Sequence, residues 1–262
     1  MKYAICSNSD VKNSQQVLDT LVSILNANNI NFEILNIENL KPDFDFAFVI
    51  GGDGTILKAG RFYADYDIPI FGINLGRLGF LSQTLPSELE KSIAKIVNNN
   101  YRVEKRLMLS SGGYKALNDF VIKSGVSGRA SRFALEIDNK FVCEYLADGI
   151  IISTPTGSTA YGMAAGGPIL TPDIDVVTVV PICPHTFTAR PIVVSADSEI
   201  KVLPVENAKY NVYADGQIAF TIDKELSIVK SDKMAQLALL PENDFYTVLR
   251  NKLHWGVSPI VS

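Results

Sequence analysis

Apolar residues in the first hundred positions form short continuous runs that alternate with helically spaced sets. Residues 46–50 are one continuous apolar run that ends in glycines, and residues 68–73 form a second. Such runs are typical of parallel strands buried on both faces. Residues 3–6 and 32–37 indicate further strands, and the apolar positions within 17–25 recur at helical spacing between them. This order predicts an α/β amino-terminal domain of Rossmann-like type, with helices on both sides of a parallel sheet.

One more helix and a polar junction mark the end of this region. Ser87 and Glu90 stand three positions apart directly after Pro86, which is the spacing of a capping box. They predict a helix that runs to about residue 97. The triple asparagine at residues 98–100 then favours a boundary. We therefore place the first domain at residues 1–100.

Short β-like segments dominate the chain from about Tyr101 to Leu240. Turn residues such as Asp215-Gly216 separate them, and one short helical stretch after Thr156-Gly157 interrupts the pattern. A second, all-β-rich carboxyl-terminal domain is therefore predicted at residues 101–240. Its expected strands cover residues 114–123, 132–137, 149–153, 176–182, 200–205, 210–214 and 226–230.

Length and composition narrow the class of protein. The chain has 262 residues, of which 47% are hydrophobic and 20% charged, so it has material for a core and is not a disordered chain. Its formal net charge of −4 argues against broad nucleic-acid binding but leaves room for a local cationic pocket. No apolar run approaches the roughly eighteen residues of a membrane span, and the first residues lack a signal-peptide hydrophobic region. The three cysteines are widely separated and favour a reducing compartment, so we expect a cytoplasmic protein without nucleic-acid or membrane partners.

A glycine-rich turn follows the first buried run. Gly51, Gly52 and Gly54 flank Asp53 at the carboxyl end of the expected parallel strand, where open α/β sheets bind their ligands. Glycines let a phosphorylated ligand approach the backbone, and a following helix offers free N–H groups to an anion. A carboxylate would repel phosphate, so Asp53 suits a general base beside a phosphoryl group. The alternative is an ordinary strand-to-helix turn, with Asp53 near the helix amino terminus.

Residues 153–161 are unusually rich in hydroxyl groups, since five of the nine are Ser or Thr. A helix cap explains one such residue, and the run supplies several, so a binding loop is favoured over a cap. Small residues at 157, 160, 162 and 164 leave room for a flat ligand. Asp148 stands just before the expected strand at 149–153, where an ordinary turn is the alternative.

Three further positions are candidate nucleotide contacts, and each could instead have an ordinary structural role. Asn118-Asp119 interrupts an apolar strand-like segment and could recognise an adenine edge and a ribose diol, or form a bulge. Lys58 and Arg132 are candidate phosphate contacts, although both could be solvated surface charges.

Taken together, these segments resemble the ATP- or polyphosphate-dependent NAD kinases. Gly-Gly-Asp-Gly alone is shared with diacylglycerol and sphingosine kinases, which leaves a lipid kinase of the same fold as an alternative. A non-catalytic nucleotide sensor is a third possibility. The hydroxyl-rich run is far more specific to NAD kinases. The matching segments are residues 51–55, 76–81, 117–119, 148–161, 166–169, 184–186 with 190–191, 215–217 and the tail at 249–253.

The resemblance implies an activity and a set of partners. It implies transfer of the γ-phosphate of ATP, or of polyphosphate, to the 2′-hydroxyl of the adenosine ribose of NAD. Mg²⁺ or another divalent cation would arrive with the donor phosphates, without a metal site made by the protein alone. A tail at residues 241–262 would return to the amino-terminal domain, and the protein would form a homodimer or homotetramer.

Carried over residue by residue, the resemblance also implies roles for the site. Asp53 would take the proton of the 2′-hydroxyl, while the three glycines around it would cradle phosphates. Asn118 and Asp119 would hold the adenylate half. The remaining nucleotide contacts would be Lys58, Arg132, Asp148, Thr156, Ser158, Thr159, Ala160, Tyr161, Gly162, Met163, Ala164 and Gln217.

Two departures from the family pattern bear on these roles. Asp119 stands where many relatives have Glu, which keeps the charge but shortens the reach of the carboxylate. The segment at 124–131 leaves open whether Arg129 or Arg132 contacts phosphate.

Overall fold

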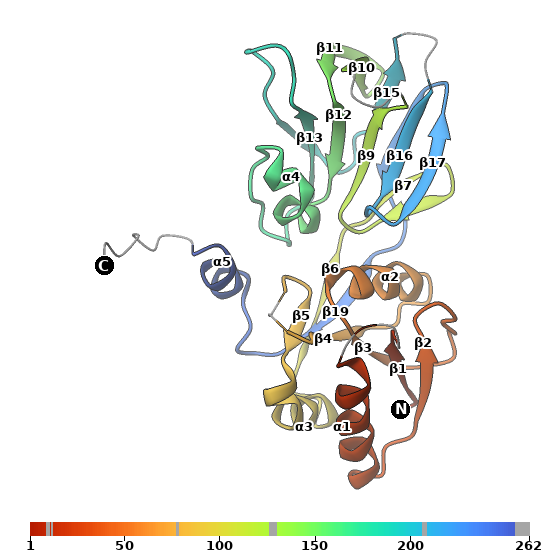
Figure 1. The fold of residues 1–262 in the computed structure, drawn as a ribbon, viewed down its shortest axis with the longest axis vertical. Helices are drawn as coiled ribbons and strands as arrows, with labels where there is room; N and C mark the ends of the chain where they lie inside the picture. The colour runs from red at the N-terminus through yellow and green to blue at the C-terminus, as the bar shows by residue number, and fades with distance from the viewer. Residues whose placement is uncertain (9–10, 12, 77–78, 126–129, 206–208, 255–262) are drawn as a thin grey trace. The chain divides into compact units, whose positions relative to one another are not determined.

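The structure is a computed structural model that describes residues 1–8, 11, 13–76, 79–125, 130–205 and 209–254 (Figure 1). By spatial contact the chain divides into two compact units. The first combines Met1–Lys105 with Ala235–Ser262, and the second is Arg106–Met234. The sequence predicted domain boundaries at residues 100 and 240, and these boundaries remain predictions.

The first unit is built on a seven-stranded sheet. Its strands follow the order β2-β1-β3-β4-β19-β6, and β5 pairs with β4. The pairs that β1 makes with β2 and β3, and that β4 makes with β3, β5 and β19, are all parallel. The predicted parallel α/β sheet is therefore confirmed. Its strands are β1 (Tyr3–Ser7), β2 (Phe32–Asn36), β3 (Phe46–Ile50), β4 (Ile70–Ile73), β5 (Ser82–Thr84), β6 (Arg102–Arg106) and β19 (Ala235–Leu239).

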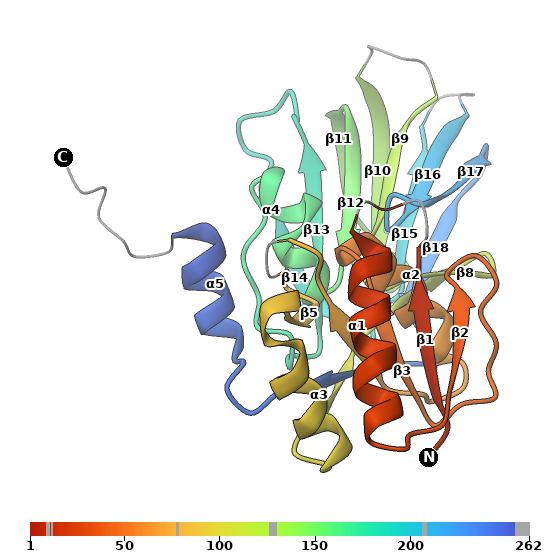
Figure 2. The same cartoon turned by 60° about the horizontal axis from the view of Figure 1, so that its bottom comes forward.

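Successive residues of a strand point to opposite faces of the sheet, and here both sets are buried. Helices therefore cover both faces. Phe46, Phe48 and Ile50 of β3 join the core cluster that holds the apolar residues of α1 and α3. On the other face, the Cys6 thiol of β1 lies 3.3 Å from the Tyr63 hydroxyl of α2. Figure 2 shows α1 and α3 together on one face of the sheet. The helices of this unit are α1 (Ser14–Ala27), α2 (Asp53–Ala64), the 3₁₀ turn η1 (Pro86–Glu88), α3 (Leu89–Val97) and α5 (Phe245–Leu253).

The expected capping box before α3 is wrong. Pro86 begins the 3₁₀ turn η1, so Ser87 lies inside a turn and not at the position before the helix. Glu88 occupies the N-cap position of α3, but its side chain makes no capping hydrogen bond. A proline at the first turn thus sets the start of the helix without help from the Ser87 hydroxyl.

The second unit consists of two antiparallel sheets with a shared apolar core. The six-stranded orders are β11-β10-β15-β18-β7-β8 and β14-β13-β12-β9-β16-β17. The predicted β-rich domain and its short helical stretch are confirmed. The elements are β7 (Leu109–Ser111), β8 (Tyr114–Ala116), β9 (Asp119–Ser124), β10 (Ser131–Ile137), β11 (Lys140–Ala147), β12 (Gly149–Ser153), η2 (Thr156–Thr159), α4 (Tyr161–Ala164), β13 (Val176–Ile182), β14 (Ile192–Ser195), β15 (Ile200–Pro204), β16 (Tyr210–Ala214), β17 (Ile218–Ile222) and β18 (Leu226–Lys230).

The segment expected as one strand at residues 114–123 is two strands in different sheets. β8 pairs with β7, whereas β9 lies between β12 and β16. The chain crosses from one sheet to the other at Leu117-Asn118, because backbone N–H groups there bind a side chain from a distant hairpin. That side chain belongs to the candidate site.

Candidate active site

The glycine-rich turn joins β3 to α2, as the sequence predicts. Gly52 is the N-cap of α2 in an extended conformation, and Asp53 is the first residue of the helix. The Gly51 N–H donates to the Ile73 carbonyl of β4 at 2.9 Å. A Cβ at Gly51 would lie 2.5 Å from Thr55 Oγ1, so the turn has no room for a larger residue there. Gly52 and Gly54 are exposed at the amino terminus of this helix, and a helix amino terminus attracts anions.

The two carboxylate oxygens of Asp53 have different surroundings. Oδ2 lies 3.3 Å from the Lys252 ammonium of α5. Oδ1 is buried and has no hydrogen-bond partner among the residues that the structure describes. Gly79 packs directly against it, since a Cβ at Gly79 would stand 2.0 Å from Oδ1. The carboxylate is therefore held between α5 and the segment before β5, and Oδ1 is packed against Gly79.

Lys58 lies about one and a half turns beyond Asp53 along α2. Its ammonium forms an ion pair with Glu38, a residue that the sequence did not connect with the site. The predicted phosphate contact would require Lys58 to exchange this partner for a phosphate. Such an exchange costs little, because exposed ion pairs contribute at most about 1 kcal/mol.

Asn118 and Asp119 are placed by a carboxylate that the predicted site did not include. Asp215 accepts the backbone N–H groups of Leu117, Asn118 and Asp119 at 3.0, 2.7 and 3.2 Å. Asp215 and Gly216 have φ values of 50° and 65° in the tight turn between β16 and β17. The Gln217 N–H closes this turn on the Ala214 carbonyl at 3.0 Å. The dipeptide Asp-Gly is a hairpin signal in the sequence, but the three acceptor bonds arise only in the fold.

Asp119 is a buried carboxyl beside a second carboxyl. Only 4% of its surface is exposed. Burial, with a smaller contribution from the charge of Asp215, raises the pKa of Asp119 from 3.8 to about 7. This group therefore titrates near neutral pH, within the segment that the sequence assigns to the adenylate half of the nucleotide.

The hydroxyl-rich run forms a closely bonded loop around η2. Thr154 Oγ1 donates to the Leu117 carbonyl at 2.6 Å and accepts the Gly157 N–H at 3.0 Å. Ser158 Oγ donates to the Pro155 carbonyl and accepts the Leu170 N–H. A Cβ at Gly157 would lie 2.1 Å from the Asn118 carbonyl oxygen. The loop thus packs on the Asn118 backbone, and the residue that precedes η2 is Pro155, which makes no side-chain capping hydrogen bond.

Several expected site residues lie at the surface of this unit. Tyr161 opens α4 and is 38% exposed, with the Lys123 ammonium 5.1 Å from its ring centroid. Asp148 is exposed just before β12, and its N–H donates to the Ile182 carbonyl. Gln217 is exposed in the hairpin turn. The rest of the run ranges from buried Thr156 and Gly162 through half-buried Thr159, Ala160 and Met163 to exposed Ala164.

Of the two candidate arginines, Arg132 lies on β10 and Arg129 lies outside the described residues. Arg132 Nη1 is 3.8 Å from a Glu144 carboxylate oxygen on the neighbouring strand β11. The structure thus brings Asn118, Asp119 and the hydroxyl-rich loop together within the second unit. Asp53, the glycines and Lys58 form a separate group in the first unit.

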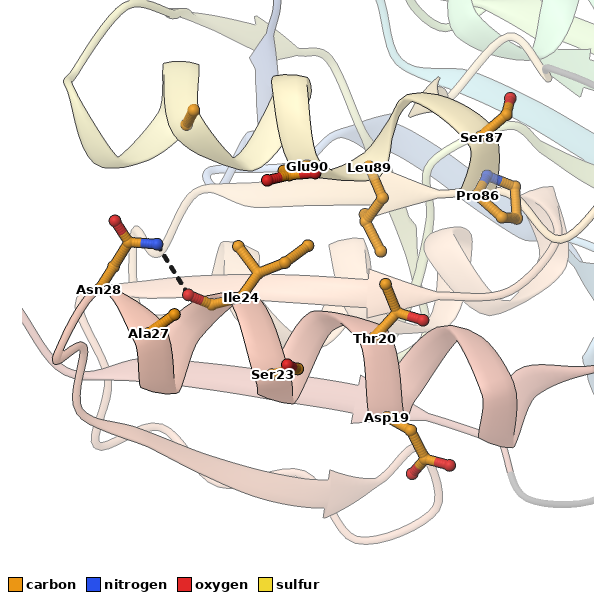
Figure 3. A pocket seen from close by; sticks show the side chains of 11 residues that line it. Asp19, Thr20, Ser23, Ile24, Ala27, Asn28, Pro86, Ser87, Leu89 and Glu90 are labelled. Atoms are coloured by element: carbon orange, nitrogen blue, oxygen red, sulfur yellow. Dashed lines mark hydrogen bonds between the residues drawn. The ribbon is translucent and has the colours of Figure 1, made fainter.

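A surface hollow elsewhere in the first unit is lined by α1 and α3 (Figure 3). Thr20, Ser23 and Ile24 reach it from one helix, and Leu89 and Glu90 reach it from the other. None of the predicted site residues is among its lining residues. The candidate functional residues thus form two groups, one around Asp53 in the first unit and one around Asn118 in the second.

Comparisons with known proteins agree with this fold and these motifs. The ATP-NAD kinase N-terminal domain family matches residues 3–101, and the ATP-NAD kinase C-terminal domain family matches residues 117–240. The NAD kinase of Pseudomonas putida strain F1 is 42% identical over 225 residues, which cover 81% of this chain and 76% of the relative. The NAD kinase of Azotobacter vinelandii is 43% identical over 227 residues, with the same coverage.

Two solved structures share the whole fold. An NAD kinase from Archaeoglobus fulgidus in complex with ATP superposes with a TM-score of 0.82 at 30% identity, over 97% of this chain and 99% of that one. A yeast NADH kinase complexed with NADH has a TM-score of 0.87 at 21% identity, over 100% and 90% of the two chains. The fold with its Gly-Gly-Asp-Gly turn is that of a kinase, a class of phosphotransferases. The chain belongs to the ATP-NAD kinase family.

Proposed function

We propose that this protein is an NAD kinase, which transfers the terminal phosphate of ATP to the 2′-hydroxyl of the adenosine ribose of NAD. The observation that supports this most directly is the place of Asp53. Its carboxylate stands at the start of α2, beside the glycine turn, and 34% of the side-chain surface is exposed. A partly exposed carboxylate next to a helix amino terminus, which attracts anions, suits a base that acts beside a phosphoryl group.

In the proposed reaction the 2′-oxygen attacks the γ-phosphorus. A new O–P bond forms there while the bond between the γ-phosphorus and the bridging oxygen breaks, and ADP leaves with the electron pair. The 2′-hydroxyl proton passes to Asp53. A secondary hydroxyl is a weak nucleophile at neutral pH, so proton acceptance and alignment both accelerate the step. The N–H groups at the start of α2 bind the negative oxygens of the donor.

The acceptor nucleotide is assigned to the second unit. Asn118 and Asp119 bind the adenosine half, with their backbone held by Asp215 and by the hydroxyl-rich loop. Asp148, Thr159, Ala160 and Tyr161 line the rest of the acceptor site. Lys58, Arg132 and Gln217 are the further nucleotide contacts. Support comes from the packing of Gly157 on the Asn118 carbonyl, which links the two motifs in one unit.

A divalent cation such as Mg²⁺ accompanies the donor in this proposal. Within the described part of the chain no three His, Cys, Asp or Glu side chains gather as a metal site. We propose an ion that is coordinated mainly by the donor phosphates. There the ion neutralises phosphate charge and orients the terminal phosphoryl group.

ATP is the donor that we favour over polyphosphate, because an NAD kinase from Archaeoglobus fulgidus with the same fold is known in complex with ATP. We also propose that the protein is cytoplasmic and forms a homodimer or homotetramer. Phe187, which is 97% exposed after β13, offers an apolar contact for a second copy.

None of the helices in the described part of the chain has the length and apolar character of a membrane span.

The decisive experiment incubates the purified protein with NAD, ATP and MgCl₂ and measures NADP with an NADP-specific dehydrogenase. Parallel reactions replace ATP by polyphosphate, or NAD by NADH. NADP above the level of a heat-denatured control supports the proposal. A folded protein, verified by circular dichroism, that forms no NADP with either donor would contradict it.

A further inference from the structure

The carboxyl-terminal helix α5 reaches the glycine-rich turn of its own unit through one side chain. Lys252 Nζ lies 3.3 Å from Asp53 Oδ2, although 199 positions separate the two residues. Lys252 belongs to the tail at 249–253 that carries part of the family resemblance. We propose that Lys252 is a positioning residue for Asp53 and supplies the positive charge that lets an anionic donor approach this carboxylate. This inference rests on the proposed role of Asp53.

Aromatic contacts restrict where the Lys252 ammonium can lie. It stands 4.9 Å from the centroid of the Phe80 ring, which attracts a cation through its π face. The Phe80 ring in turn lies 6.3 Å from Phe245, the first residue of α5. Phe80 follows Gly79, the residue that packs against the other oxygen of Asp53. The start of α2, the segment 79–80 and α5 therefore meet at one carboxylate.

The helix that carries Lys252 is itself fixed to the first unit. Asp244 caps α5 by accepting the Thr247 N–H at 2.9 Å. Val248 and Leu249 are buried, and Asn243 donates to the Gln83 carbonyl at 2.7 Å just before the helix. Because the helix is anchored at its start and along one side, Lys252 is presented to Asp53 from a defined backbone.

The charges explain why this lysine matters for phosphoryl transfer. An isolated Asp53 carboxylate would repel the phosphates that bind at the same helix terminus. The Lys252 ammonium offsets that repulsion and orients Oδ2, while Oδ1 stays unpartnered among the described residues. When Asp53 takes the hydroxyl proton it loses its charge, and the ammonium is then left to balance the transferred phosphate.

The test compares Lys252→Gln and Lys252→Arg with Arg250→Gln. Arg250 lies on the same helix, and its guanidinium donates to Thr247 Oγ1, so it serves as a matched control. We expect Lys252→Gln to lower kcat/KM for ATP by about 10- to 100-fold and to weaken ATP binding in titration calorimetry. Lys252→Arg should recover most of the loss, and Arg250→Gln should stay within about twofold of the wild type. Equal melting temperatures would show that the fold is retained.

A double variant separates a positioning role from a structural one. If Lys252 acts on turnover through Asp53, Lys252→Gln should change kcat by less than about twofold in the Asp53→Asn background. An equal loss in both backgrounds, or a Lys252→Gln variant with wild-type kinetics and ATP affinity, would overturn the inference. Wild-type protein that forms no NADP, but in which Lys252→Gln still weakens ATP binding, would contradict the proposed function and leave the Lys252 charge role standing.

Discussion

Asp53 combines a charge partner on one oxygen with a buried, unpartnered second oxygen. The ion pair with Lys252 keeps the carboxylate at the helix start, whereas Gly79 leaves just enough space for Oδ1. A sequence pattern indicates the aspartate between glycines but does not reveal this asymmetry. Because a third of the side chain stays exposed while one oxygen is packed against Gly79, the carboxylate is both accessible and fixed in position, which suits a base.

The first prediction concerns the charge of this residue. Asp53→Asn keeps the size of the side chain but removes its ability to accept a proton, so turnover should fall by about two or more orders of magnitude. NAD affinity should change little, since the adenosine contacts are assigned to the second unit. Steady-state kinetics and titration calorimetry measure the two effects. A large loss of NAD binding would instead indicate that Asp53 has a binding or structural role.

The second prediction concerns the space beside Asp53. In Gly79→Ala the new Cβ would stand 2.0 Å from Oδ1, so the carboxylate must move and NADP formation should fall at least tenfold. Gly76→Ala is the matched control, because a Cβ there meets nothing within 4 Å among the described residues and its backbone is not left-handed. Rate measurements on both variants test this. Equal activities would mean that the Asp53 position tolerates displacement.

At the scale of elements, the crossing from β8 to β9 depends on a carboxylate from another hairpin. The Asp215 carboxylate accepts three successive backbone N–H groups at this point. Because these groups need no partner strand, the chain can leave one sheet and enter the other. The periodicity of residues 114–123 is β-like throughout, so the sequence predicted a single strand. The polar pair Asn118-Asp119 was the only local sign of the break.

A third prediction follows from the buried Asp119 at the start of β9. Its pKa of about 7 exceeds the usual value, so the folded state holds this proton while the unfolded chain releases it near pH 4. The free energy of unfolding should therefore fall as pH rises from about 4 to about 7, by on the order of 4 kcal/mol, and level off above pH 7. Asp119→Asn should lack this dependence. Denaturant unfolding at pH 4 and pH 8 measures it for both proteins.

Asp148→Asn is the control for that prediction, because Asp148 is an exposed carboxyl in the same unit. Its pH dependence should match that of the wild type. A wild-type pH dependence that persists in Asp119→Asn would show that another group binds the proton.

Prediction of elements from the sequence succeeded where the signal was local. Residues 46–50 and 149–153 have the bounds of β3 and β12, since their continuous apolar character reflects burial on both faces. The strands at Arg102–Arg106 and Lys140–Ala147 were missed, because exposed and charged residues weaken their pattern. Such strands are stabilised by pairing with neighbours, which a window of sequence does not contain.

At the scale of the molecule, the chain returns to its first unit after completing the second. β19 lies between β4 and β6, and Leu237 of β19 pairs with Ile70. The return is secured by the Leu240 N–H, which donates to Gln83 Oε1 at 3.1 Å. The first unit therefore depends on residues from both ends of the sequence.

The fourth prediction tests this dependence by truncation. A chain that ends at Met234 lacks β19 and α5 and should not fold its first unit. Five lost apolar side chains contribute about 1.5–3 kcal/mol each, which together is comparable to a total stability of about 5–15 kcal/mol. They are Leu237, Leu239, Leu240, Val248 and Leu249. Circular dichroism and limited proteolysis should show loss of helix and rapid cleavage within residues 1–105.

The control for this truncation is a chain that ends at His254, which keeps β19, α5 and their described contacts. It should keep the helix signal and the protease resistance that the chain ending at Met234 loses. If the chain ending at Met234 also melted like the full-length protein, the strand β19 would be dispensable.

The sequence by itself determined the two kinds of domain, the strand–turn–helix around Asp53 and the motifs that mark the family. These features depend on local periodicity, on glycine at tight turns and on helix termini, all of which lie within a few residues of one another. The tertiary structure alone decided that Lys252 pairs with Asp53, that Asp215 holds Asn118 and that β19 completes the first sheet. In each case the partners lie about a hundred or more positions apart. Their contact depends on how whole elements pack, because the energy of bringing distant segments together comes from the folded core and not from local pattern.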